Sequence, residues 1–248
     1  MNKNDLQRQQ DATDTHWPQE SIPFRGFNKN GDLRVYYHGI LPHWRQSNCT
    51  YFVTFRLADA LPAGVIREFK ECRDKWLQAR GISIPRSDPN KMAWETTIGK
   101  LSKSDQRLYE QIMAKRLNQY LDAGYGRCIL RQPKIRLIVA EALTYFHGQR
   151  VLTGDFVVMP NHVHVLMRPL GEHELEAVLH SIKSFTANVI NQTCGTQGSL
   201  WMRESYDHIV RDCEQLEAFQ RYIASNPKKA RLAANEYTLG RADYTLEG

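Results

Sequence analysis

Two histidines in an apolar stretch have the residue type and spacing of a metal site. His162 and His164 are two positions apart in the segment MPNHVHVLMR, residues 159–168, directly after a Pro-Asn turn. Because side chains alternate between the two faces of a strand, both imidazoles point to the same face. The apolar run at 156–159 also reads as a strand, so the segment predicts a hairpin with the histidines near the start of its second arm. Ordinary hydrogen bonding on a half-buried strand is equally compatible with such a pair.

A tyrosine and an asparagine share one face of a helix farther along the chain. Apolar residues recur at helical spacing across 216–223 and predict a short amphipathic helix. Tyr222 and Asn226 are four positions apart, so they lie one above the other on this helix. Pro227 favours the end of the helix there. From residue types alone, Tyr222 is also compatible with core packing and Asn226 with a role at the helix end.

The ordered set of motifs resembles the REP-associated tyrosine transposases, which belong with the single-tyrosine HUH transposases acting on single-stranded DNA. The motifs that carry the resemblance are MPNHVHVL at 159–166, GSLW at 198–201, YDHIVR at 206–211 and YIASNP at 222–227. An amphipathic helix is expected between the first two. The resemblance covers about residues 36–232, and the ordered set is more specific than any single motif.

The resemblance implies a role for four residues. It implies that His162 and His164 bind a divalent metal, that Tyr222 attacks the DNA, and that Asn226 is the third metal ligand. Imidazoles tolerate Mn²⁺, whereas Mg²⁺ prefers oxygen ligands and retains water, so we expect Mg²⁺ or Mn²⁺. Zinc is compatible with the same ligands, although a hydrolytic zinc site commonly has three protein ligands in a more nearly tetrahedral set.

The implied chemistry is the cutting and rejoining of one DNA strand. A phenol has an ordinary pKa of about 10, so only about a thousandth is ionised at neutral pH and its attack on a phosphodiester needs help. A metal ion at the phosphate neutralises charge and stabilises the leaving 3′ oxygen. The product is a 5′-phosphotyrosine, from which the strand can be rejoined without a nucleotide energy source. The resemblance implies a substrate of single-stranded, hairpin-forming DNA with REP-like palindromic repeats, and a chain that acts as a monomer or homodimer.

The charge of the chain favours a polyanionic partner. The formal net charge is +6 and the pI is near 9.1. Six basic residues near the predicted tyrosine helix are the expected DNA contacts: Arg203, Arg211, Arg221, Lys228, Lys229 and Arg231. Contacts with the DNA backbone give salt-dependent affinity without reading base sequence. A solvated cationic surface accounts for the same residues without a partner.

Several other residues have two interpretations. Phe185, Trp201 and Tyr206 either stack on unpaired bases or belong to the core. Tyr206 is also the rival nucleophile, but its segment reads as extended and has no partner at helical spacing. Lys183 and the following serine either contact phosphate or face solvent.

The order of the predicted elements gives an α+β fold. A β-branched and aromatic strand at 50–56 is followed by helical segments, the histidine hairpin, a further helix and the tyrosine helix. This order fits an antiparallel sheet with helices packed mainly on one face, and the resemblance implies a ferredoxin-like arrangement. Residues 58–130 look like a helical insertion after the first strand.

Length and composition predict one elaborated domain, and a cytoplasmic location is expected by default. The resemblance to DNA-cutting transposases implies that the protein is associated with the nucleoid when bound to DNA. Residues 1–35 read as a polar, flexible N-terminal arm, 36–232 as a single HUH transposase-like domain and 233–248 as a C-terminal tail. The sequence has no long apolar run and its first twenty residues are polar, so neither a membrane span nor a secretory signal is expected. The five scattered cysteines read as reduced thiols.

Two other functions were weighed from the residues. A histidine-triad nucleotide hydrolase also uses alternating histidines on a strand, but the third alternating position here is Leu166. A noncatalytic protein that binds single-stranded or hairpin nucleic acid, derived from a transposase, is compatible with the fold. Covalent capture of DNA that depends on a divalent metal separates catalysis from binding.

Overall fold

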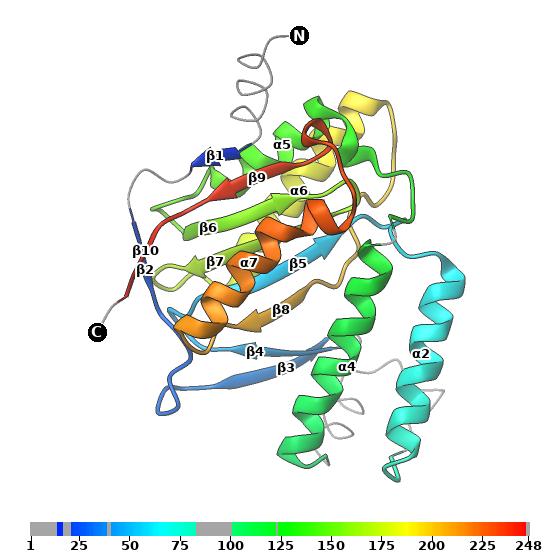
Figure 1. Cartoon of the computed structure of the whole chain (residues 1–248), viewed down its shortest axis with the longest axis vertical. Helices are drawn as coiled ribbons and strands as arrows, with labels where there is room; N and C mark the ends of the chain where they lie inside the picture. Colours follow the sequence, from blue (N-terminus) through cyan, green and yellow to red (C-terminus); the bar gives the residue numbers. More distant parts are fainter. Residues whose placement is uncertain (1–13, 17–20, 39–40, 83–100, 123, 247–248) are drawn as a thin grey trace.

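The computed structural model describes the chain except for residues 1–13, 17–20, 39–40, 83–100, 123 and 247–248. A six-stranded sheet with the order β1-β9-β6-β7-β5-β8 positions the rest of the molecule (Figure 1). These strands are β1 (Asp14–His16), β5 (Tyr51–Arg56), β6 (Val151–Val158), β7 (His162–Pro169), β8 (Tyr206–Ile209) and β9 (Thr238–Arg241). All neighbours pair antiparallel except β1 and β9, which are parallel. The predicted α+β class with an antiparallel sheet is confirmed.

Strands β6 and β7 form the hairpin that the sequence predicts. The register places Val158 opposite Val163, and the backbone N–H of Met159 donates to the carbonyl of His162 at 2.8 Å. Strand β7 is buried along its whole length and pairs with β6 on one side and β5 on the other. The two histidines therefore begin a strand in the interior of the sheet, where the backbone is held from both sides.

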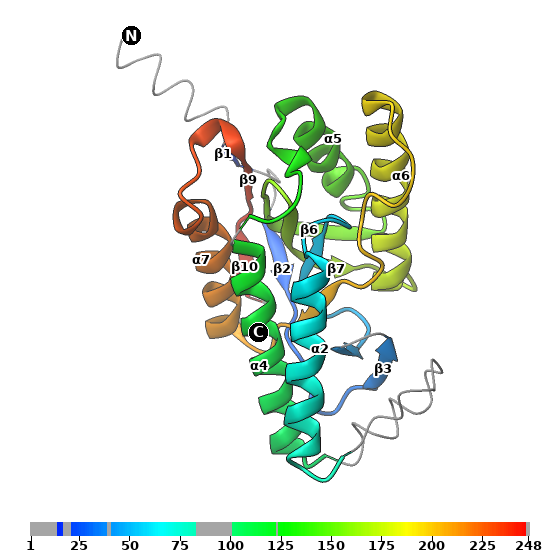
Figure 2. The same cartoon turned by 90° about the vertical axis from the view of Figure 1, so that its right-hand side faces the viewer.

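The two faces of the sheet carry separate hydrophobic cores. The covering helices are α5 (Pro133–Thr144), α6 (Leu175–Cys194) and α7 (Cys213–Lys229). Val165 belongs to the core beneath α5 and α6, whereas the next residue, Leu166, belongs to the core beneath α7. Figures 1 and 2 show α7 on one side of the strands and α5 and α6 on the other. Two of these three helices share a face as predicted, and the third brings Tyr222 to the face of the histidines.

Helix α7 begins and ends at residues with identifiable roles. The side chain of Asp212 accepts a hydrogen bond from the backbone N–H of Gln215 at 2.8 Å, which satisfies a free donor of the first turn. The prediction that the helix stops at Pro227 is wrong by two residues, because the helix continues to Lys229. A proline removes only its own N–H and crowds the preceding turn, so one final turn still forms after it.

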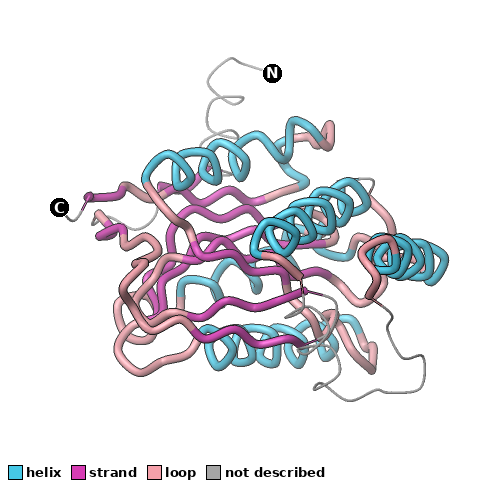
Figure 3. The backbone as a smooth tube through the Cα atoms, turned by 90° about the horizontal axis from the view of Figure 1, so that it is seen from below, coloured by secondary structure: helices cyan, strands magenta, loops and turns pink. Residues whose placement is uncertain are grey.

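Two long helices extend away from the sheet. They are α2 (Ala63–Gln78) and α4 (Lys103–Asp122), which lie side by side in Figures 1 and 2 and are seen nearly end-on in Figure 3. Leu77, Tyr109 and Met113 are fully buried and join the core beneath α5 and α6. The helical character predicted for 58–130 is thus present in its described parts, which also include a 3₁₀ turn, η1 (Ile129–Arg131).

Both ends of the chain contribute strands. Beyond β1 and β9, a two-stranded parallel ribbon joins β2 (Ile22–Phe24) to β10 (Tyr244–Leu246). A further antiparallel pair joins β3 (Arg34–His38) to β4 (Leu41–Arg45). Within the described residues of the predicted flexible arm, β1 pairs with β9 and β2 pairs with β10. The segment predicted as a C-terminal tail contains β9, which also pairs with the central strand β6. Backbone pairing does not require an apolar sequence, and that is why composition missed these strands.

Candidate active site

The two imidazoles of β7 meet at their Nε2 atoms. His162 and His164 are 1% and 0% exposed, and their Nε2 atoms lie 3.0 Å apart. The Nδ1 atom of His162 lies 2.7 Å from Oδ1 of Asn161, and the Nδ1 atom of His164 lies 2.7 Å from Oγ1 of Thr54. Each ring is therefore oriented from its Nδ1 side, and the two Nε2 atoms face each other within hydrogen-bond distance.

The hydrogen bonds around Asn161 identify the tautomer of His162. The Nδ2 atom of Asn161 donates to the backbone carbonyl of Tyr125 at 3.0 Å, so the atom facing His162 is the carbonyl oxygen Oδ1. An amide oxygen only accepts, so Nδ1 of His162 carries the proton and Nε2 keeps its lone pair. An outer partner that fixes a histidine in this way is typical of metal-binding imidazoles.

Burial keeps both histidines uncharged. It lowers the pKa of His162 to about 3, with a further contribution from the positive charge of Arg56. Burial also lowers the pKa of His164 well below its ordinary value, and the neighbouring His162 adds to the effect. Because only a neutral imidazole can ligate a metal, the pair is in the correct protonation state at neutral pH.

Helix α7 places Tyr222 above the histidines. The ring of Tyr222 lies 5.1 Å from that of His164 and 5.8 Å from that of Phe52, in both cases edge to face. Phe52 in turn stacks on Phe219 of the same helix, with ring centroids 4.2 Å apart. The packing of α7 on the sheet thus brings the predicted nucleophile and the predicted ligands of one chain together.

Asn226 is a buried amide whose atoms lack partners in the described part of the chain. It is 0% exposed, and neither Oδ1 nor Nδ2 makes a hydrogen bond to a described residue. Leaving such a group unsatisfied costs about 1–3 kcal/mol, so a binding partner at this amide would stabilise the folded protein. Among the described residues no three His, Cys, Asp or Glu side chains cluster as a metal site.

The residues present fit a divalent ion. Two neutral imidazoles 3.0 Å apart suit neighbouring positions on an octahedral ion, whose ligand bonds are about 2.1 Å long. The amide of Asn226 supplies an oxygen from the helix that also carries Tyr222. The three predicted ligands thus come from two elements that the cores of the protein hold in place.

The six predicted DNA contacts are all exposed, but they are spread along α7 and its flanks. Arg211 precedes the helix, whereas Lys228 and Lys229 lie in its last turn. The Nζ atom of Lys229 lies 5.0 Å from the ring centroid of Tyr222, within the range of a cation–π contact. Arg221 pairs with Glu217 on the surface of the helix at 3.2 Å. Of the six, Lys229 is the one that the described contacts place at Tyr222.

The structure separates the residues that had two interpretations. Trp201 is a core residue, 4% exposed, whose Nε1 donates to Oγ1 of Thr186. Phe185 is 55% exposed on α6. Lys183 donates to the backbone carbonyls of Met202 and Arg203, so its ammonium holds a loop. Tyr206 lies on extended β8 as predicted, and it pairs with Thr54 on the histidine face of the sheet.

Three supporting residues were missed by the sequence analysis. Thr54 and Asn161 orient the two imidazoles, and Arg56 pairs in register with His162. The signal for two of them was present, because Thr54 and Arg56 occupy the alternate positions of the strand whose apolar residues were recognised.

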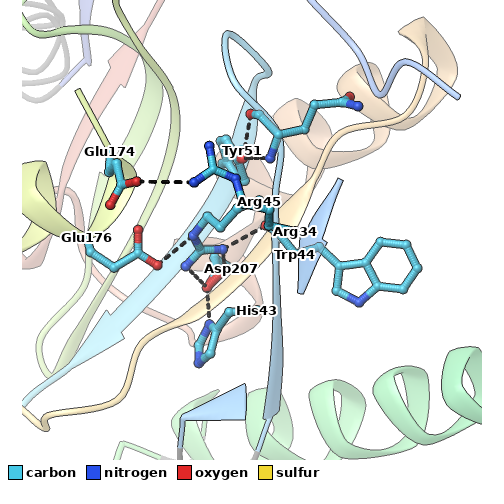
Figure 4. Close-up of polar contacts among 9 residues, drawn as sticks. Arg34, His43, Trp44, Arg45, Tyr51, Glu174, Glu176 and Asp207 are labelled. Atoms are coloured by element: carbon cyan, nitrogen blue, oxygen red, sulfur yellow. Dashed lines mark hydrogen bonds and ion pairs between the residues drawn. The ribbon is translucent and has the colours of Figure 1, made fainter. Parts of the chain in front are cut away.

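A second buried polar group lies on the opposite face of the sheet. Its centre is formed by the buried His43 and Asp207, which are joined by the half-buried Arg45 and the exposed Glu176. We refer to these four residues as the ion-pair cluster (Figure 4). Asp207 contacts both His43 and Arg45, and Arg45 also pairs with Glu176 at 2.6 Å. Burial acts to raise the pKa of Asp207, but the hydrogen bond from His43 and the charge of Arg45 outweigh it and lower the pKa.

Part of this chain is similar to a known family of transposases. Residues 134–226 match the family model described as IS200-like transposase, and this segment contains His162, His164, Tyr222 and Asn226. The transposase resemblance of the sequence is thereby confirmed. No curated protein matches the chain. A solved structure, described as a REP-associated tyrosine transposase bound to a REP hairpin, is 15% identical with a TM-score of 0.36, over 78% of this chain and 72% of that chain. None of the described helices is long and apolar enough to cross a membrane.

Proposed function

Because residues 134–226 match the IS200-like transposases, we propose that this protein cuts and rejoins single-stranded DNA through Tyr222. The observation that carries the proposal is the histidine site, which we define as His162, His164, Tyr222 and Asn226. Two neutral imidazoles converge at 3.0 Å, the tyrosine ring lies 5.1 Å from one of them, and an unsatisfied buried amide lies one turn farther along the same helix.

His162, His164 and Asn226 are the proposed ligands of Mg²⁺ or Mn²⁺. When bound, the ion supplies charge neutralisation at a phosphate and stabilisation of a leaving oxygen. Thr54 and Asn161 hold the imidazoles with their Nε2 atoms converging. The apolar ring of Phe52 fixes the position of Tyr222 through its edge-to-face contact. The protein thus prepares its ligands and its nucleophile before DNA arrives, which lowers the entropic cost of the reaction.

Tyr222 is the proposed nucleophile. Its phenolic oxygen forms a bond to phosphorus while the bond from phosphorus to the 3′ oxygen breaks. The phenolic proton leaves and the 3′ oxygen gains one, so the products are a 5′-phosphotyrosine and a free 3′ hydroxyl. No water, oxidant or nucleotide is consumed, and attack by a 3′ hydroxyl on the phosphotyrosine reverses the step. Since Tyr222 and the histidines belong to one chain, we propose that this arrangement acts without a tyrosine from a second subunit.

Hairpin-forming, REP-like DNA is the proposed substrate. The exposed basic residues along α7 offer contacts to the backbone of a strand that passes Tyr222. Lys229, which lies over the ring of Tyr222, is the contact expected nearest the cut. These contacts predict affinity that falls as salt is raised.

Covalent capture of DNA tests the proposal. Labelled single-stranded hairpin DNA from repeats flanking the gene is incubated with Mg²⁺ or Mn²⁺ and resolved on a denaturing gel. We expect a metal-dependent adduct with wild type and with Tyr206→Phe, but none with Tyr222→Phe. Tyr206 is a matched control, because it is a partly buried tyrosine on the same face of the sheet. Binding without an adduct in wild type would instead favour a noncatalytic DNA-binding protein.

A further inference from the structure

Arg56 is a buried cation at the edge of the histidine site. It is the last residue of β5, it is 4% exposed, and it lies directly opposite His162 in the register of β5 and β7. Cross-strand partners of an antiparallel pair have Cβ atoms about 5 Å apart on the same face. The guanidinium of Arg56 therefore belongs to the face that carries both imidazoles and Tyr222.

The hydrogen bonds of Arg56 are sparse for a buried guanidinium. Within the described part of the chain, its Nε donates to the sulfur of Met202 at 3.3 Å, and no carboxylate lies within ion-pair distance. A thioether is a weak acceptor, whereas a guanidinium has five donors. Glu204 affects Arg56 through its charge alone, and burial dominates over it and lowers the pKa of Arg56.

Arg136 shows how this protein satisfies a buried arginine that has a structural role. It is also 4% exposed, but its guanidinium donates to Oγ1 of Thr238 and to the backbone carbonyls of Leu130, Arg131 and Asn235. Those bonds connect α5, η1 and the segment before β9. Arg136 and Arg56 are equally buried, so the difference between them is the missing set of acceptors at Arg56.

We propose that Arg56 binds the phosphate group that Tyr222 attacks. This inference rests on the proposed function and adds an anion site on β5, outside the segment that matches the transposase family. The planar guanidinium matches two phosphate oxygens at once, and a buried cation that makes no ion pair with a described carboxylate gains most from such a partner. Because Arg56 lies opposite His162, it holds the phosphodiester next to the proposed metal ligands and close to Tyr222.

The loop beside Arg56 keeps the guanidinium in place. The backbone N–H of Met202 donates to the carbonyl of Arg56 at 2.9 Å, and Lys183 of α6 donates to the carbonyl of Met202 at 2.6 Å. Burial, followed by the charge of Arg56, lowers the pKa of Lys183 to about 8. Two cations are thus gathered at one end of the sheet, and the carbonyls of the loop satisfy Lys183 but leave Arg56 available for an anion.

The test measures binding without cutting. Fluorescence anisotropy with a labelled single-stranded hairpin oligonucleotide in EDTA compares wild type with Arg56→Met and Arg56→Lys. We expect Arg56→Met to lose about ten- to a hundred-fold in affinity, the range for hydrogen bonds to a charged group. The slope of log affinity against log salt should fall by about 0.7, as for one lost phosphate contact on a single strand. Arg56→Lys should retain an intermediate affinity, because it keeps the charge but loses the planar pair of donors.

Two control variants separate binding from folding. Arg136→Met, which removes an equally buried but fully bonded arginine, should lower the melting temperature, whereas Arg56→Met should leave it unchanged or raise it. Arg150→Met, at an exposed arginine that stacks on Phe146 at the far end of the hairpin, should bind DNA like wild type.

A separate experiment measures the melting temperature of wild type and Arg56→Met with and without inorganic phosphate. A phosphate-induced rise in melting temperature that is lost in Arg56→Met would show that the phosphate group alone is recognised.

The outcomes separate this inference from the proposed function. Wild-type affinity and salt dependence in Arg56→Met would overturn the anion site, even if wild type forms a covalent adduct. A melting temperature that falls in Arg56→Met as it does in Arg136→Met would assign Arg56 a structural role and also overturn it. Loss of affinity in Arg56→Met together with no adduct in wild type would support the anion site and reject the covalent mechanism.

Discussion

The two faces of one sheet bury polar groups in opposite ways. In the ion-pair cluster, Asp207 contacts both His43 and Arg45, and Arg45 also contacts Glu176. In the histidine site, the two Nε2 atoms face each other and the amide of Asn226 lacks a partner among the described residues. On both faces, a buried polar group costs free energy unless it has a partner. The ion-pair cluster is closed, because its members recover that cost from one another, whereas we propose that the histidine site is open and recovers it by binding a ligand.

The largest effect is expected when a predicted ligand of the open site is removed. His164→Ala should abolish metal-dependent DNA cutting, a loss of at least about 100-fold if metal assistance supplies several kcal/mol. Some stability should also be lost, because the variant leaves a cavity beside Phe52 and removes the hydrogen-bond partner of Thr54, so the assays are run at a temperature at which the variant is folded. The measurement is the rate of adduct formation, with calorimetric titration of Mn²⁺ as a second readout. Retained cutting and Mn²⁺ binding would exclude His164 as a ligand.

Breaking the ion-pair cluster should lower the stability of the fold without removing any residue of the histidine site. Asp207→Ala leaves His43 and Arg45 buried without their shared carboxylate, which should cost about 3–5 kcal/mol of unfolding free energy. Glu217→Ala is the matched control, because its ion pair with Arg221 is exposed and should contribute about 0.3–0.5 kcal/mol. Denaturant titration measures both variants. Equal losses in the two would mean that the cluster is no more structural than a surface pair.

Most mutations of buried residues lower the stability of a protein, but an apolar residue in the histidine site should leave the stability unchanged or raise it. Asn226→Leu removes a buried amide that has no partner among the described residues, so the free energy of unfolding should stay unchanged or rise by about 1–3 kcal/mol. Adduct formation should fall at the same time, because the proposed third ligand is gone. Thermal denaturation and the adduct assay give the two readouts. A strong loss of stability would indicate that Asn226 already has a structural partner.

The smallest expected effect is the pH dependence of the closed cluster. Although burial acts to lower the pKa of His43, the hydrogen bond and charge of Asp207 raise it above its ordinary value of about 6.5. The stabilisation from His43 is therefore fully present below pH 6.5 and is lost as pH rises through the raised pKa. The pKa of Asp207 is lowered in the folded protein. The stabilisation that Asp207 contributes is therefore present above its ordinary pKa of about 3.9, and it is lost as the pH falls through the lowered pKa.

His43→Gln isolates the alkaline part of this dependence. The stability difference between wild type and the variant should shrink between pH 6 and pH 9, by about 1.4 kcal/mol for each unit by which the pKa is raised. Denaturant titrations at several pH values provide the measurement. A difference that stays constant over that range would contradict the raised pKa.

The sequence predicted the parts of the open site that depend on local pattern. Alternation along 162–168 placed both histidines on one face, and four-residue spacing placed Tyr222 and Asn226 on one side of a helix. The meeting of these two elements is not local. It depends on the packing of α7 on the face of Phe52 and Leu166, and here the family resemblance supplied what the periodicity did not.

The parts that sequence reasoning missed depend on partners far away in the chain. Thr54 and His164 are separated by 110 positions, and their hydrogen bond follows from the register of β5 and β7. The same register gives Arg56 its place beside His162. Strand β9 lies in the segment that was expected to be a C-terminal tail, and it becomes part of the sheet through backbone pairing with β6. Register and edge pairing are decided by tertiary structure, so composition and local periodicity do not report them.

Peptide mapping of the covalent adduct tests the central claim most directly. Wild-type protein is trapped on labelled hairpin DNA in Mg²⁺ or Mn²⁺, digested with trypsin and nuclease, and analysed by mass spectrometry. Trypsin cleaves after Arg221 and Lys228, so Tyr222 and Tyr206 fall in different peptides. We predict that the nucleotide mass is on the peptide of residues 222–228 and on Tyr222 within it. A nucleotide on the peptide that contains Tyr206, or on a serine or histidine, would contradict the account.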